Sequence, residues 1–373
     1  MPRPSTRHAS HAGSWYTSDP RKLDDQLSTW LEATAHPAKG DPLTNAPVKG
    51  CKAIIAPHAG YSYSGPAAAF AYRCIDVDNI KRVFVLGPSH HVYLDGCALS
   101  KCNEYETPIG NLPLDLDTIA ELKATGKYDQ MDLSTDEDEH SIEMHLPYVR
   151  KIFEGRDIHI VPILVGSIST ASEKRFGALL APYLADPATL FVVSSDFCHW
   201  GRRFRYTHYH PPGSDDVRDG VTLKAGNFAE TVGRGEEGGG GGEVWEGIDK
   251  LDHLGMDAIA FSLPASSSSS SSSTTTAKSP STAHDQFAAY LAATRNTICG
   301  RHPIGVLLGA LAALEHGGGG DGEGEGSEGG WSERGMRCEW VRYEQSSRVR
   351  SLGDSSVSYA SGFVAVGGGS AEA

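Results

Sequence analysis

Residues 53–61, Ala53-Ile-Ile-Ala-Pro-His-Ala-Gly-Tyr61, hold a short apolar run that stops at a proline and is followed by His58. Two later stretches repeat this pattern: Val83-Phe-Val-Leu-Gly-Pro-Ser-His-His91 and Leu190-Phe-Val-Val-Ser-Ser-Asp-Phe-Cys-His199. Continuous apolar runs of this length are typical of parallel strands that are covered on both faces. Open parallel sheets bind ligands just beyond the carboxyl ends of their strands. We therefore expect three strand ends to converge on one site.

The remaining pattern predicts an α/β fold in a single domain, with a mainly parallel wound sheet flanked by helices. Helices are expected over 20–35, 117–125, 171–184, 244–261 and 306–314, with another starting at 67–72 after turns at Gly60 and Gly65, and further strands over 159–165 and 189–193. The tail segments 338–343 and 356–366 alternate like strands, and we expect them to complete an edge of the sheet.

The last third of the chain has a different composition. Gly-, Ser- and acid-rich tracts occur near 213–243, 264–283 and 316–330. Such tracts bury too little apolar surface to offset the entropy of ordering, so we interpret them as low-complexity surface insertions. The predicted domain then spans 8–366, with flexible termini at 1–7 and 367–373.

Composition and charge narrow the class of protein. The formal net charge of −14 disfavours nucleic acid as a partner. The seven cysteines are odd in number and form no Cys-x-x-Cys pair, which indicates reduced intracellular thiols. No apolar signal core and no uncharged segment long enough to span a bilayer occur in the sequence. We expect a cytoplasmic protein without a membrane span, with the nucleus as a second location.

His58 and His90 each follow a predicted strand and a Pro or Pro-Ser turn. A rigid scaffold of this kind can hold an imidazole where a metal ion requires it. The alternative is that they are packing or helix-capping histidines, although two at equivalent strand ends favour the metal interpretation. His91 is the weaker of its pair because adjacent side chains rarely point to the same place, and we assign it to the surroundings of the site or to the surface.

Asp196 and His199 lie three residues apart just after a strand, so the carboxylate could orient the imidazole for proton transfer. Alternatively, Asp196 caps a turn or the next helix. Cys299 is followed by Arg301 and His302, whose positive charge would favour a thiolate, although a lone cysteine before a helix is usually structural. A hydrolase with Cys299 as nucleophile and His199 and Asp196 as its partners is a further alternative, which no local protease signature supports.

Two charged stretches allow a structural or a functional interpretation. Glu139, His140 and Glu143 lie in an acidic block at helical spacing and either line the rim of the pocket or form a solvated face. Residues 202–209 interleave arginines with aromatic residues. Because no RNA-binding signature is present, a small anionic ligand or an ordered surface loop is the better explanation.

Long motifs throughout the chain resemble the Memo family, which comprises cytosolic proteins named for mediating receptor-driven cell motility. The resemblance covers nearly the whole chain and rests on Ser10-His-Ala-Gly-Ser-Trp-Tyr16, Ile55-Ala-Pro-His-Ala-Gly-Tyr61, Leu86-Gly-Pro-Ser-His-His91, Thr135-Asp-Glu-Asp-Glu-His-Ser-Ile-Glu-Met-His-Leu-Pro147, Phe191-Val-Val-Ser-Ser-Asp-Phe-Cys-His-Trp-Gly201, Asn296-Thr-Ile-Cys-Gly-Arg-His-Pro-Ile-Gly305 and Asp354-Ser-Ser-Val-Ser-Tyr359. The three biased tracts fall between these motifs.

The resemblance implies a fold similar to that of the class III extradiol non-haem iron dioxygenases. It places His58, His90 and Cys299 at the family's metal-ligand positions, and Asp196 and His199 among the residues that line the pocket, where we expect catalytic roles. A thiolate in place of the dioxygenases' carboxylate is softer, which suits iron(II) or copper(I), with zinc chemically possible. We therefore do not expect classical ring cleavage.

Two functions follow from the resemblance. In the first, the protein is a metal-dependent oxidoreductase that binds iron or copper, reacts with oxygen, and is linked to signalling and to cell motility or growth. In the second, it is a non-enzymatic signalling adaptor whose vestigial pocket binds peptides from receptors or from regulators of the cytoskeleton.

Overall fold

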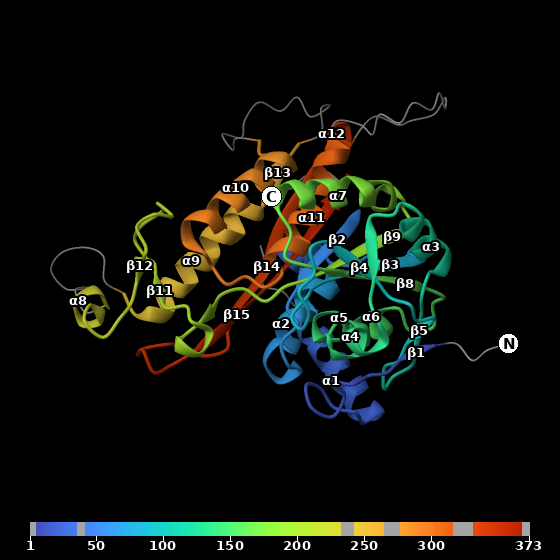
Figure 1. Ribbon diagram of the computed structural model, residues 1–373, viewed down its shortest axis with the longest axis horizontal. Coiled ribbons are helices and arrows are strands. Elements are labelled where there is room, and N and C mark those ends of the chain that lie inside the picture. Colours follow the sequence, from blue (N-terminus) through green and yellow to red (C-terminus); the bar gives the residue numbers. More distant parts are fainter. Residues whose placement is uncertain (1–4, 36–41, 233–241, 265–276, 316–330, 368–373) are drawn as a thin grey trace.

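The computed structural model describes residues 5–35, 42–232, 242–264, 277–315 and 331–367 (Figure 1). A large mixed sheet forms its centre, in the order β13 (Phe261–Leu263), β14 (Met336–Gln345), β15 (Ser356–Val366), β2 (Cys51–Ala56), β9 (Thr189–Ser194), β3 (Arg82–Pro88), β8 (His159–Val165), β4 (Cys97–Leu99) and β7 (Tyr128–Gln130). The short strand β10 (His199–Trp200) pairs with β15. An α/β domain built on one large sheet agrees with the sequence prediction.

The parallel part of the sheet is smaller than predicted. β2, β9, β3 and β8 pair in parallel, whereas β15, β14 and β13 on one side and β4 on the other are joined by antiparallel ladders. All six residues of β2 and of β9 are buried, as expected for strands covered on both faces. The parallel prediction is therefore right for the four central strands and for the outer pair β4 and β7, and wrong for β13, β14 and β15 and for the contact between β8 and β4.

Helices cover both faces of this sheet. On one face lie α7 (Thr170–Ala185) and α11 (Arg301–Glu315), with α10 (Pro280–Thr294) and α9 (Val244–Ile259) beside them. The other face is covered by α2 (Tyr61–Arg73), α5 (His140–Glu143), α6 (Leu146–Ile152) and α1 (Pro20–Ala33). Side-chain alternation along β3 shows the two layers: the ring of Phe84 lies 5.4 Å from that of Tyr183 in α7, whereas Gly87 lies against Ser141 and Ile142 of α5.

Close packing between α7 and α11 depends on a glycine. A Cβ at Gly177 would lie 2.4 Å from the backbone nitrogen of Ala310, which is closer than real atoms approach. The backbones of the two helices therefore touch where Gly177 lies, and α11 is held rigidly against the sheet.

The remaining elements are short and lie around the sheet. They are β1 (Thr6–Arg7), β5 (Glu104–Tyr105), β6 (Leu112–Pro113), β11 (His208–Tyr209), β12 (Val221–Thr222), α3 (Leu116–Ala124), α4 (Leu133–Asp138), α8 (Phe228–Val232), α12 (Trp331–Arg334), and the 3₁₀ turns η1 (Pro42–Asn45) and η2 (Arg202–Phe204). Within the described ranges, no helix is both long enough and apolar enough to cross a membrane.

Several predicted boundaries differ from the structure. The tail strand β15 lies inside the sheet between β14 and β2, and the edge is formed by β13. β1 pairs with β5, and the side chain of Arg7 is fully buried, so the ordered chain starts before residue 8. Of the tracts interpreted as insertions, residues 233–241, 265–276 and 316–330 lie outside the described residues, but β12, α8 and the start of α10 fall within the predicted insertions.

Candidate metal centre

Three strand ends meet at one edge of the parallel sheet. His58 follows β2, His90 follows β3 and Asp196 follows β9, and these three strands run in the same direction. Cys299 lies just before α11. One ligand atom each from His58, His90 and Cys299 can be chosen so that all lie within 4.8 Å of one another. The residues come from distant parts of the sequence, and the parallel topology brings them together.

The ring of His58 is oriented by a serine at the end of β9. Its Nδ1 lies 2.6 Å from Oγ of Ser194, and that hydroxyl donates its own hydrogen to the carbonyl oxygen of Ser141 at 2.7 Å. The hydroxyl must therefore accept a hydrogen from Nδ1, which leaves Nε2 of His58 with a free lone pair. Burial keeps the pKa of His58 well below its usual value, so the ring is neutral. A neutral imidazole with an available Nε2 is what a metal ion requires.

The ring of His90 is oriented by Glu139. One carboxylate oxygen accepts the backbone N–H of His90 at 2.7 Å, and the other lies 2.9 Å from its Nδ1. Burial opposes ionisation of Glu139, but the hydrogen bonds that it accepts from the ring and the backbone of His90 outweigh burial and hold the pKa of Glu139 at about 2. Nε2 of His90 is thus available to coordinate a metal ion. A carboxylate that orients a ligating histidine in this way is common at metal sites.

His140 forms the wall beside these ligands. Its ring stacks on that of His90 with centroids 4.4 Å apart and lies 5.5 Å from that of His58. His90, Glu139 and His140 form a second group whose ligand atoms are close enough to hold a metal. Because the Glu139 oxygens already accept N–H groups of His90, we favour the first group as the metal centre.

Cys299 completes the first group. Its Sγ lies 3.2 Å from Nε2 of His58 and accepts the backbone N–H of Asp196, also at 3.2 Å. Cys299 retains some exposure, yet the surrounding protein and the carboxylate of Asp196 raise the pKa of its thiol well above the usual value, more than Arg301 lowers it. Arg301 therefore favours the thiolate as expected, but burial and Asp196 outweigh its effect. His302 instead binds Glu173 at 2.7 Å.

Asp196 acts on the backbone of the site. One carboxylate oxygen accepts the N–H of His58 at 2.8 Å, which corresponds to the capping interpretation of this residue. Burial is the main influence on this group and raises the pKa of Asp196 to about 7. Asp196 therefore fixes the turn after β2 from which the His58 ring projects.

His199 lies beside the centre with a defined tautomer. Its Nδ1 is 2.9 Å from the carbonyl oxygen of Phe197 and 3.0 Å from that of Thr297, so Nδ1 carries the hydrogen and Nε2 does not. Burial lowers the pKa of His199, although the hydrogen bonds to the backbone of Thr297 and Phe197 oppose this shift. The predicted orientation of this ring by Asp196 is thus replaced by backbone carbonyls.

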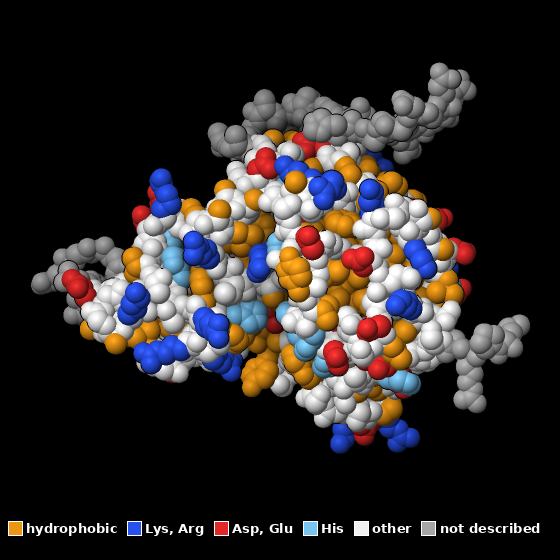
Figure 2. All heavy atoms as spheres, viewed as in Figure 1, with side chains coloured by type: hydrophobic (Ala, Val, Ile, Leu, Met, Phe, Trp, Pro, Cys, Tyr) orange, Lys and Arg blue, Asp and Glu red, His pale blue; other side chains and the backbone are white. Residues whose placement is uncertain are grey.

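Sequence reasoning missed several supporting residues. Ser194 and Ser141 orient His58, and Arg7 binds Glu143 through an ion pair of 2.6 Å between two fully buried side chains. Glu139 and Glu143 had a signal in the sequence, their place in the acidic block. Figure 2 shows histidine side chains near the middle of one face, with several Lys and Arg side chains on the left of them and Asp and Glu side chains on the right.

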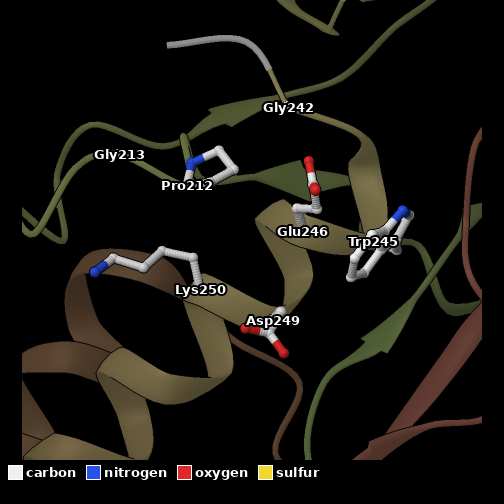
Figure 3. A pocket seen from close by; sticks show the side chains of 7 residues that line it. All are labelled: Pro212, Gly213, Gly242, Trp245, Glu246, Asp249 and Lys250. Atoms are coloured by element: carbon white, nitrogen blue, oxygen red, sulfur yellow. The ribbon is translucent and has the colours of Figure 1, made fainter. Parts of the chain in front are cut away.

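A surface hollow of about 520 Å³ lies away from this centre, against α9 (Figure 3). Its lining contains none of the predicted site residues and consists of Pro212, Gly213, Gly242, Trp245, Glu246, Asp249 and Lys250.

Cys198, between Asp196 and His199, is fully buried, as expected of a structural thiol.

Comparisons with known proteins agree with the motifs. The sequence model described as Memo-like protein matches residues 7–363. Protein MEMO1 of Xenopus tropicalis is 42% identical over 362 residues, covering 96% of this chain and 97% of the relative. Protein MEMO1 of Homo sapiens is 42% identical over 365 residues with the same coverage. Protein memo-1 homolog of Caenorhabditis elegans is 38% identical over 361 residues, covering 97% of this chain and 83% of that protein. The chain therefore belongs to the Memo family.

Proposed function

We propose that this protein binds a redox-active metal ion through His58, His90 and Cys299. One observation carries the proposal: these three donors lie within 4.8 Å of one another, while Nδ1 of each histidine is engaged by Ser194 or Glu139. Both rings therefore have Nε2 available. Two imidazole nitrogens and one sulfur suit iron(II) or copper(I), with zinc chemically possible.

Bound iron or copper would supply redox chemistry with oxygen. The chain contributes the environment: Ser194 and Glu139 orient the two imidazoles, and Asp196 fixes the turn that bears His58. Nε2 of His199 is unprotonated and can accept a proton beside the centre. We retain Asp196 and His199 as the proposed catalytic residues, with Asp196 acting through position.

A fold similar to that of the class III extradiol dioxygenases belongs to the same proposal. It is supported by the site at the carboxyl ends of parallel strands and by the two strand-end histidines. Ring cleavage is not expected, because a soft and oxidisable sulfur stands where those enzymes use a carboxylate. By analogy with the family, we place the protein in the cytoplasm, with the nucleus as a second location, in pathways of signalling and cell motility or growth.

The test is metal analysis of full-length protein purified without added metal. We expect bound iron or copper in the parent protein and a sharp loss in His90→Ala and Cys299→Ser. Two variants serve as matched controls and should retain the metal. His91→Ala removes the exposed histidine next to His90, and Cys338→Ala removes a buried cysteine in β14. Stoichiometric metal in folded Cys299→Ser protein would contradict the assignment.

A second function, a signalling adaptor, is favoured by exposed aromatic side chains near the site residues in sequence. Tyr93, two residues after His91, is 85% exposed, and Tyr63 in the first turn of α2 is 60% exposed. Aromatic side chains of this kind often anchor protein partners. In this case Tyr63→Ser and Tyr93→Ser should abolish capture of receptor-derived or cytoskeletal-regulatory peptides, whereas Cys299→Ser should not. If Cys299→Ser alone abolishes capture, the metal centre and the peptide site are not separate.

A further inference from the structure

An arginine-rich turn follows His199. Arg202, Arg203 and Arg205 are all exposed, in a chain whose formal net charge is −14. Among the residues that the structure describes, no carboxylate lies within ion-pair distance of any of the three. Three such guanidinium groups within four residues concentrate positive charge in one place, where it can attract an external anion.

The turn is held rigidly next to the centre. Gly201 has a φ of +127°, and a Cβ there would lie 2.8 Å from Cβ of Ser355. The N–H of Gly201 donates to the carbonyl oxygen of Tyr206 at 2.7 Å. Trp200 is fully buried, and its ring N–H donates to the carbonyl oxygen of His208 at 2.7 Å. These contacts therefore hold the backbone that carries the three arginines in a defined conformation.

Of the three arginines, Arg203 has a defined path to the centre. Its guanidinium carbon lies 4.4 Å from the centre of the Phe204 ring, and that ring meets the His199 ring edge to face at 5.2 Å. The guanidinium is thus separated from His199 by one aromatic side chain. The stacking holds the guanidinium in place but leaves its N–H donors without a carboxylate partner.

We propose that Arg203 binds the anionic group of a small organic ligand whose other end enters the metal pocket. The planar fork of an arginine matches a carboxylate or a phosphate group in a bidentate contact. The stacked Phe204 ring and the fixed turn reduce the entropy lost when such a contact forms. The orientation of the ligand rests on the proposed metal centre, whereas the anion contact itself does not.

The experiment uses benzoate and phenyl phosphate as probes of the two anionic groups, and benzamide as an uncharged analogue. Binding to the full-length protein is measured by titration calorimetry, in metal-free and in iron(II)-loaded protein. We expect at least one anionic probe to bind more tightly than benzamide, and Arg203→Ala to weaken it by about tenfold or more. Arg202→Ala and Arg205→Ala are the matched controls and should change binding by less than about twofold. The anionic probe that binds more tightly identifies the ligand group.

A second readout locates the probe. In iron(II)-loaded protein, the aromatic protons of the bound probe should relax faster than in metal-free protein, and this enhancement should disappear in Arg203→Ala. Equal weakening in all three arginine variants, or stronger competition by a short oligonucleotide than by phenyl phosphate, would overturn the inference in favour of a diffuse polyanion surface. Probe binding that persists in folded Arg203→Ala would also overturn it.

The two proposals fail in different ways. If the protein binds no metal but Arg203 is still required for probe binding, the metal centre is wrong and the anion contact stands. If metal binds through His58, His90 and Cys299 but Arg203→Ala does not weaken probe binding, only the anion contact is wrong.

Discussion

Replacement of Glu139 by glutamine tests how the site orients His90. The carboxylate accepts the backbone N–H of His90 at 2.7 Å, its Nδ1 hydrogen at 2.9 Å, and the backbone N–H of Ser141 at 2.9 Å. Glutamine has nearly the same shape but carries no charge and offers only one oxygen. If that oxygen continues to accept the Nδ1 hydrogen of His90 and the backbone N–H of Ser141, the new amide NH₂ must face the backbone N–H of His90. Two donors then face each other, and that hydrogen bond is lost.

The size of the effect follows from this geometry. Loss of a carboxylate that orients a ligating histidine typically weakens metal binding by about 10- to 100-fold, which corresponds to roughly 1.4–2.7 kcal/mol. Because the side chain of Glu139 is only 2% exposed, solvent cannot replace the missing acceptor. We therefore expect the dissociation constant for iron(II) in Glu139→Gln to rise by about 10- to 100-fold.

The assay is anaerobic competition for iron(II) between the full-length protein and a chromophoric chelator. Glu154→Gln is the matched control, because the side chain of Glu154 is 73% exposed. Circular dichroism establishes that both variants are folded. An unchanged affinity in folded Glu139→Gln protein would refute the reasoning, because it would show that the Glu139–His90 contact does not prepare a metal ligand.

Further predictions concern stability, each measured by urea unfolding. Gly177→Ala should cost about 2 kcal/mol or more, because its Cβ would lie 2.4 Å from the backbone nitrogen of Ala310, whereas Gly213→Ala has nothing within 4 Å and should be nearly neutral. An equal effect of both would contradict the close helix contact. Burial lowers the pKa of Lys52 to about 8, so the unfolded chain, with a lysine pKa near 10.4, binds more protons between these values. The free energy of unfolding of the parent relative to Lys52→Met should therefore rise by about 2–3 kcal/mol from pH 8 to pH 10.4, and a constant difference would show that this lysine is not desolvated. Asp252→Asn should cost about 1–3 kcal/mol, because the buried carboxylate accepts hydrogen bonds from Cys198, Asn296 and Tyr343; a neutral effect would mean that these donors find other acceptors.

The central strands were predictable because their signal is local. The strand His159–Val165 has the predicted boundaries, and α1, α3, α7 and α9 begin within one residue of the predicted positions. Apolar runs and capping residues are properties of short segments, so they can be recognised without knowledge of the fold. A short apolar run that is buried on both faces is typical of a central strand. The histidines at the ends of β2 and β3 were found for the same reason, since parallel strands present their carboxyl ends together.

Helix α2 was predicted to begin later than it does. Gly60 and Gly65 indicate turns, and Pro66 usually disfavours a helix interior, yet α2 starts at Tyr61 and includes Gly65 and Pro66. The reason for the glycine lies elsewhere in the chain: a Cβ at Gly65 would lie 2.5 Å from the ring of Trp30 in α1. A local pattern cannot report such a contact.

The supporting contacts of the site were hidden from the sequence for a similar reason. Arg7 and Glu143 are 136 positions apart, and nothing near either residue indicates the buried ion pair between them. The pKa of Cys299 was misjudged because Arg301 is adjacent in sequence, whereas the desolvation that decides the protonation state comes from the whole fold. Sequence patterns therefore identified candidate ligands better than they described the surroundings of those ligands.

The position of β15 has a consequence for protein synthesis. This strand lies against β2, the strand that bears His58, yet it follows Cys299 in the chain. During translation, every proposed metal ligand is synthesised before β15. At that stage one side of β2 still lacks its neighbouring strand. The unpaired backbone N–H and C=O groups of β2 can then attract strands from other chains. Premature termination between residues 300 and 356 should therefore yield a polypeptide that contains all the proposed ligands but aggregates, because β2 then lacks the neighbour that only the final strand provides.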